Sequence, residues 1–192
     1  MKSAFCDERI CVVYDTQRFF MGENMSEQGH HAATLRQLLQ LIDAEPDRFM
    51  EAEEALEDAL LEARNHDLPP FWAAYHLLQH EAVFAAEWAD IFDLVDDLRA
   101  VAANWQADVF FGVQEADDEP LVFETEPRLL LAHAAQELQG YGLTLWRWQV
   151  DNPDLCVGFI SREEDEAAVR RCAAVLDAAI VAVRDEEVAD EW

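Results

Sequence analysis

Apolar residues recur at helical spacing from residue 30 to about residue 105, and the pattern then changes. After Trp105 the chain consists of short, nearly continuous apolar runs that are separated by acidic turns and followed by segments of helical spacing. Such runs favour strands, and the turns between them favour hairpins. The sequence therefore predicts an α+β fold. We expect a helical N-terminal layer (about residues 30–105) packed with a small antiparallel sheet of two hairpins, each followed by a helix (about residues 106–184).

The first half contains two strong helical patterns. Pro46 is a favourable first residue for a helix, and apolar residues after it share one helical face. These residues are Phe49, Ala52, Leu56, Ala59, Leu60 and Ala63. The stretch from Phe71 to Trp105 lacks Gly and Pro, and its second half is strongly periodic. The periodic residues are Trp88, Ile91, Phe92, Val95, Leu98, Val101 and Trp105. One helix of that length is unusual in a globular domain, so we expect a break near Phe84–Glu87.

The second half predicts two hairpins. The first pairs Val109–Val113 with Leu121–Phe123, and the second pairs Leu143–Val150 with Leu155–Ile160. Trp146 lies two residues from Trp148, so both indoles would share one face of a strand. With few basic residues nearby, these indoles are expected to cover a core beneath a helix rather than to stack on nucleic-acid bases.

Each hairpin is expected to lead into a helix on the same face of the sheet. Thr125 would cap the first helix, which Gly140 would end. Ser161, with Glu164 three residues later, predicts a capping box for the second helix. That helix would bury Val169, Cys172, Leu176, Ala179, Ile180 and Val183.

The length of 192 residues favours one domain, or two small ones that share an interface. We place a single domain at residues 25–192. It comprises the helical half (30–105), the hairpin–helix half (106–184) and an acidic tail (185–192). For residues 1–24 two expectations compete. Codons for the Gly-Glu pair before Met25 can form a ribosome-binding sequence, which would make residues 1–24 a non-native or poorly packed extension. Alternatively, Ile10–Tyr14 is β-prone and would form an N-terminal strand.

Charge restricts the partners of this chain. Forty-one acidic residues against thirteen basic ones give a formal charge of −28. A surface this negative repels phosphates and anionic lipids and attracts basic proteins, so we expect neither direct nucleic-acid binding nor membrane binding. The alternative is a composition bias of the whole proteome, because Lys2 is the only lysine. No apolar run approaches the roughly 20 residues that span a bilayer, and the four cysteines form no CxxC pair, which favours a cytoplasmic protein. The candidate ribosome-binding sequence before Met25 is of the bacterial type and favours a bacterial source.

Histidines offer the strongest candidate metal site. His76 and His80 would lie one turn apart on a helix, and with a third ligand, such as His66 or His133, they could hold zinc for a metal-dependent hydrolase. The surrounding sequence matches neither HExxH nor HxxEH. Ser161 is interpreted as a helix cap, and Cys156 lies in an apolar run, so neither is an activated nucleophile. No cofactor motif is present, and none is expected.

An acidic stripe carries the leading functional hypothesis. On the helix that Pro46 opens, the outer face consists of Glu51, Glu54, Asp58 and Glu62. Carboxylates that recur each turn can imitate a nucleic-acid backbone or bind a basic protein, as in DNA-mimic, inhibitor and immunity proteins. Asp90, Asp93 and Asp97 would extend this surface if they lie on the same side. An ordinary solvated helix face is the alternative. A homodimer would instead need a carboxylate-poor interface, for which the Trp88–Trp105 stripe is the candidate.

Overall fold

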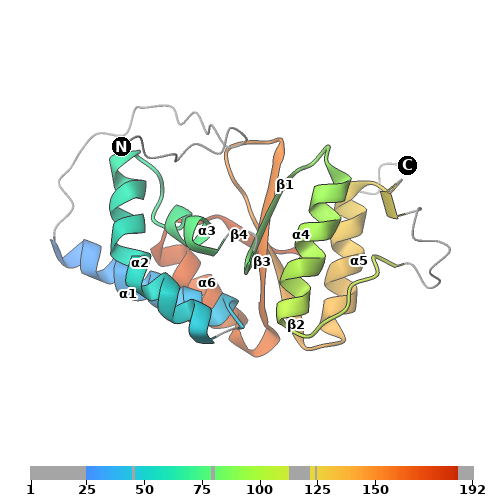
Figure 1. The fold of residues 1–192 in the computed structure, drawn as a ribbon, viewed down its shortest axis with the longest axis horizontal. Coiled ribbons are helices and arrows are strands. Elements are labelled where there is room, and N and C mark those ends of the chain that lie inside the picture. Colours follow the sequence, from blue (N-terminus) through green and yellow to red (C-terminus); the bar gives the residue numbers. More distant parts are fainter. Residues whose placement is uncertain (1–24, 45, 79–80, 113–121, 124, 186–192) are drawn as a thin grey trace.

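A four-stranded antiparallel sheet, in the order β1-β3-β2-β4, lies between two layers of helices in the computed structural model (Figure 1). The structure describes residues 25–44, 46–78, 81–112, 122–123 and 125–185. The strands are β1 (Val83–Glu87), β2 (Leu143–Trp148), β3 (Leu155–Arg162) and β4 (Ile180–Ala182). The helices are α1 (Met25–Ile42), α2 (Pro46–Asn65), α3 (Trp72–Leu78), α4 (Ile91–Asn104), α5 (Pro127–Gln139) and α6 (Glu166–Val175), with short 3₁₀ turns η2 (Glu163–Asp165) and η3 (Val183–Asp185). The α+β fold class is confirmed.

The central strand β3 is apolar on both sides, and this explains why helices cover both faces of the sheet. Successive side chains of a strand point to opposite faces. Leu155, Val157 and Phe159 therefore join one buried cluster, while Cys156 and Ile160 join a second cluster across the sheet. Each cluster needs its own cover, so helices pack on both faces. The expectation that helices cover one face of the sheet is wrong, because the strands have no polar side.

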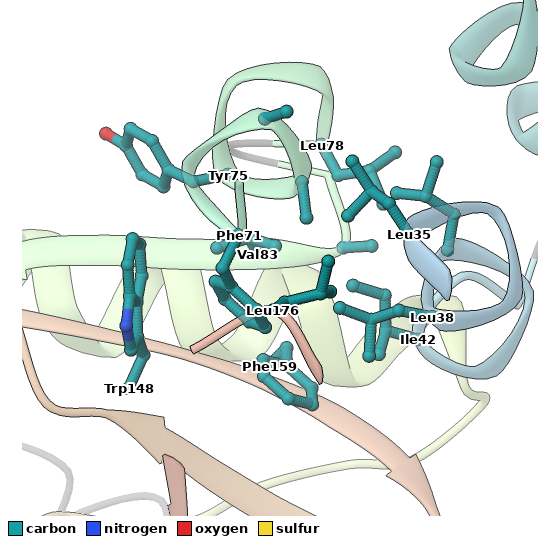
Figure 2. Packing of buried hydrophobic residues seen from close by; sticks show 14 of the residues in the cluster. Leu35, Leu38, Ile42, Phe71, Tyr75, Leu78, Val83, Trp148, Phe159 and Leu176 are labelled. Carbon is teal, nitrogen blue, oxygen red and sulfur yellow. The ribbon is translucent and has the colours of Figure 1, made fainter. Parts of the chain in front are cut away.

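The larger layer contains α1, α2, α3 and α6 (Figure 1). Phe71, directly before α3, packs against Trp148 with ring centroids 4.7 Å apart and against Phe159 at 6.1 Å. Figure 2 shows Phe71 and Phe159 between Trp148 on one side and Leu38 and Ile42 of α1 on the other. Trp146 and Trp148 are both buried in this cluster, as expected. The smaller layer contains α4 and α5, whose buried leucines cover the other face.

The helical stretch that was expected to break near Phe84–Glu87 consists of α3, β1 and α4. Its expected break coincides with β1, which pairs antiparallel with β3. The sheet is thus built from both halves of the chain. α4 buries Val95, Leu98 and Val101 as the periodicity predicts, but Phe92 is 63% exposed.

The two predicted hairpins fare differently. β2 and β3 form the second hairpin, with Thr144 opposite Ser161. The first hairpin is not observed where the chain is described, because residues 109–112 form no strand and residues 122–123 lie in a 3₁₀ turn. Residues 113–121 lie outside the described part. The fourth strand is β4, in a segment expected to be helical: α6 ends at Val175, and Ala179 is exposed.

Neither hydroxyl residue caps a helix. Glu126 caps α5 and accepts a hydrogen bond from the backbone N–H of Leu129 at 3.1 Å. Ser161 belongs to β3, and its buried hydroxyl accepts a hydrogen bond from the indole Nε1–H of Trp146 at 2.9 Å. Gly140 ends α5 as predicted. The expectations for residues 1–24 and for most of the tail concern residues outside the described ranges.

Candidate functional site

The outer face of α2 carries the predicted acidic stripe. Its opposite face is buried against the large layer through Ala52, Leu56, Ala59 and Ala63. Because a helix turns about 100° per residue, burial of that face directs the stripe outward. We call Glu51, Glu54, Asp58 and Glu62 the α2 acidic face. The first three residues are exposed, and Glu62 is half-buried.

The carboxylates of this face have few partners. Glu62 lies 3.4 Å from Nε2 of His66, its neighbour one turn later. Beside the face, Glu53 accepts a hydrogen bond from Nε of Arg36 at 2.6 Å, which ties α1 to α2. Within the described residues, the carboxylates of Glu51, Glu54 and Asp58 make no hydrogen bond or ion pair. No side chain that the structure describes therefore neutralises their charges.

The acidic residues of α4 do not extend this face. α2 and α4 lie in different layers on opposite sides of the sheet (Figure 1). Asp90 caps α4, since its Oδ1 accepts a hydrogen bond from the backbone N–H of Asp93 at 3.1 Å. Asp97 accepts a bond from the backbone N–H of Ala85 in β1 at 3.4 Å. Asp90 and Asp97 thus have structural roles, and the single surface combining α2 and α4 is not formed.

The histidines that the structure describes do not converge. His76 lies on α3, where its ring stacks on Trp72 with centroids 5.1 Å apart and planes 7° from parallel. His66 lies just beyond α2, whereas His133 lies on α5 across the sheet. His80 is outside the described residues. In the described ranges no group of three or more His, Cys, Asp or Glu side chains could hold a metal ion.

No activated nucleophile appears among the residues proposed from sequence. Cys156 and Cys172 are buried free thiols, as expected. Burial raises the pKa of the Cys172 thiol above its ordinary value, and the nearby charge of Arg171 only partly offsets this. A raised pKa keeps the thiol protonated and unreactive. The hydroxyl of Ser161 is buried and accepts the hydrogen bond from the Trp146 indole, so it is not available as a nucleophile.

Most residues of the Trp88–Trp105 stripe are buried in, or packed against, the core of the smaller layer. The exception is Phe92, whose ring stacks on Phe123 at 4.3 Å. Trp88 is half-buried, and the guanidinium groups of Arg128 and Arg147 each lie 5.9 Å from its ring centroid. The stripe is therefore not a free apolar face.

Sequence reasoning missed one surface feature, a hollow of about 470 Å³ at the end of the sheet where β2 begins and β3 ends. It is lined by Trp105, Tyr141, Gly142, Leu143, Arg162, Glu163 and Glu164. These residues come from three distant segments, so no local pattern could have grouped them.

Comparison with curated proteins and with solved structures finds no match to this chain. No helix of the described residues is both long enough and apolar enough to cross a membrane. A family model does match, over residues 24–183. This range includes every described helix and strand, and only the end of η3 lies beyond it. The chain therefore belongs to the family described as Domain of unknown function (DUF6630).

Proposed function

We propose that the protein is a non-enzymatic binding module that engages a basic protein through the α2 acidic face. The observation that carries the proposal is the outward row of Glu51, Glu54 and Asp58, whose carboxylates have no partner in the described part of the chain. On a helix, residues four positions apart lie about 6 Å apart along the axis. This is close to the spacing of neighbouring phosphates on a nucleic-acid strand, so a basic surface that binds phosphates could bind this row.

Electrostatics would mainly determine how fast the two proteins associate. Complementary charge raises association rates and makes them sensitive to salt, whereas exposed pairs each contribute at most about 1 kcal/mol. Leu61 and Met50 lie exposed on the same helix and would add apolar contact area. We place this interaction in a bacterial cytoplasm, where free thiols such as Cys156 persist.

The test neutralises the face without changing side-chain volume. The variant combines Glu51→Gln, Glu54→Gln and Asp58→Asn. A matched control removes the same number of charges elsewhere, by Asp96→Asn on α4 and by Asp151→Asn and Asp154→Asn in the turn between β2 and β3, all exposed positions. Each tagged full-length protein is used to capture partners from host lysate at low salt. Bound proteins are eluted with a salt gradient and identified by mass spectrometry.

We expect one basic protein to elute sharply from the wild type and from the control. From the α2 variant it should elute at clearly lower salt, with roughly tenfold weaker affinity when the purified pair is measured. Equal weakening in both variants would mean that only net charge matters. In that case the α2 acidic face would be an ordinary solvated surface.

A further inference from the structure

The hollow at the end of the sheet is lined by aromatic and charged side chains from three segments of the chain. One wall is Trp105, the residue that follows α4 as its C-cap. A second wall is Tyr141, which is 49% exposed and lies in the turn between α5 and β2. The third wall is the junction of β3 and η2, with Glu163 and Glu164. Its volume of about 470 Å³ is large enough for a long side chain.

Backbone contacts hold these walls in place. The backbone N–H of Glu163 donates to the carbonyl oxygen of Gly142 at 2.9 Å, which joins two of the walls. A Cβ at Gly142 would meet no atom within 4 Å, so this position faces open space. The chain after Trp105 is tied to α5 by Glu137, whose carboxylate accepts hydrogen bonds from the backbone N–H groups of residues 110, 111 and 112 at 2.7, 3.2 and 2.7 Å.

The electrostatic environment of the hollow favours a cation. α4 ends at Asn104, one residue before Trp105, and α5 ends at Gln139, two residues before Tyr141, so both helices direct their C-termini to the rim. A helix C-terminus carries a partial negative charge of about half an elementary charge. Neither helix has a basic residue in its last turn to compensate it. Glu163 and Glu164 add two carboxylates to the same place.

Two arginines near the hollow each lie close to one of its carboxylates. Arg162 also lines it, but its Nη1 lies 3.8 Å from Oε1 of Glu164, which is too long for a hydrogen bond. Its side chain is 64% exposed and therefore well solvated. Arg184 pairs with Glu163 at 3.3 Å and also with Glu166. One carboxylate of the lining, Glu164, thus has only a long and solvent-exposed ion pair with Arg162.

We infer that the hollow binds an arginine side chain of the basic partner. A planar guanidinium can lie against the rings of Trp105 and Tyr141 while its N–H groups donate to a carboxylate of Glu164 or Glu163. This inference rests on the proposed function for the existence of a basic partner. It adds a specific recognition site to the general attraction of the α2 acidic face.

The test uses a small probe and therefore does not depend on knowing the partner. The blocked amino acid N-acetyl-arginine amide is titrated into the full-length protein, and the indole N–H signal of Trp105 is followed by ¹H–¹⁵N NMR. The signal is assigned from a Trp105→Phe variant. Parallel titrations use the uncharged isostere N-acetyl-citrulline amide and free arginine. The variant Glu163→Gln/Glu164→Gln is compared with the α2 variant described above, and circular dichroism checks that both are folded.

We expect saturable shifts of the Trp105 signal with blocked arginine and none with blocked citrulline. The Glu163→Gln/Glu164→Gln variant should bind roughly fivefold more weakly, and the α2 variant should bind as the wild type does. Equal binding of citrulline, or unchanged binding by the Glu163→Gln/Glu164→Gln variant, would overturn the inference. Stronger binding of free arginine would also overturn it, since the site would then take a free amino acid.

The two proposals can fail separately. If the probe does not bind but partner capture still depends on α2, the hollow is not a recognition site and the proposed function stands. If the probe binds but no α2-dependent partner is captured, the proposed function fails and the hollow is a site for guanidinium groups of another source.

Discussion

At the scale of single residues, Gly158 is the position that packing restricts most clearly. It lies in β3 opposite Phe84 and Arg147. A Cβ there would come within 3.0 Å of both the backbone oxygen of Trp146 and the ring of Phe84. The ring of Phe84 thus occupies the space that a side chain would need. Glycine lets the ring of Phe84 pack directly against the central strand.

We predict that Gly158→Ala lowers the free energy of unfolding by about 1–3 kcal/mol, because the backbone oxygen cannot move aside. Urea denaturation measures the change. Gly29→Ala is the matched control, since a Cβ at Gly29 in α1 meets nothing within 4 Å. It should instead stabilise the protein by about 0.5–1 kcal/mol. If Gly158→Ala is as stable as the wild type, the close packing of Phe84 on β3 is wrong.

At the scale of elements, the carboxylate of Asp90 has a structural role, as the N-cap of α4, whereas the carboxylates of the α2 acidic face are proposed to bind a partner. Replacing the N-cap by Asp90→Ala removes its bond to the backbone N–H of Asp93 and should cost about 1 kcal/mol. Asp90→Asn keeps an acceptor and should retain most of the stability. Neither change should affect capture of a partner through α2, which lies across the sheet. Thermal unfolding and the capture assay measure both outcomes, and a loss of capture by Asp90→Asn would contradict this assignment.

The elements also show where sequence patterns are sufficient. α2 and the β2–β3 hairpin were predictable, because each combines a clear apolar pattern with strong end signals, such as Pro46 for α2. β1 could not be predicted from its sequence, because its two consecutive alanines favour a helix and its pairing with β3 is long-range. β4 is only three residues long and follows α6 closely, so its apolar residues continue the helical spacing. In both cases tertiary pairing overrides local preference.

At the scale of the whole molecule, the sheet determines which predicted site residues can act together. Exposure of the α2 acidic face followed from helical periodicity alone, because one side of the helix is apolar. Its separation from Asp93 and Asp97 did not follow, because it depends on β1 turning the chain to the other side of the sheet. The hollow could not be predicted for the same reason. Its residues Trp105, Tyr141 and Glu164 come together only because two helices and a strand end at the same place in the fold.

The net charge of −28 should have opposite effects on folding and on binding. Folding gathers the carboxylates into a small volume, where they repel one another, so screening should stabilise the folded state. Raising NaCl from about 0.01 M to about 1 M shortens the screening length from about 30 Å to about 3 Å. We expect a stabilisation on the order of 1 kcal/mol, or an increase in Tm of about 2–4 °C. The same salt should release the basic partner.

Local repulsion on α2 gives this prediction a control. Like charges three and four residues apart destabilise a helix, so Glu51→Gln/Glu54→Gln/Asp58→Asn should raise Tm at low salt and reduce its dependence on salt. The Asp96→Asn/Asp151→Asn/Asp154→Asn protein should change less, because its substitutions are spread over separate elements. Calorimetry at both salt concentrations measures these differences. A wild-type Tm that stays constant or falls with salt would show that repulsion among the carboxylates does not limit stability. The α2 acidic face would then not lower the stability of the folded protein, and its acidic residues would need no binding function to account for them.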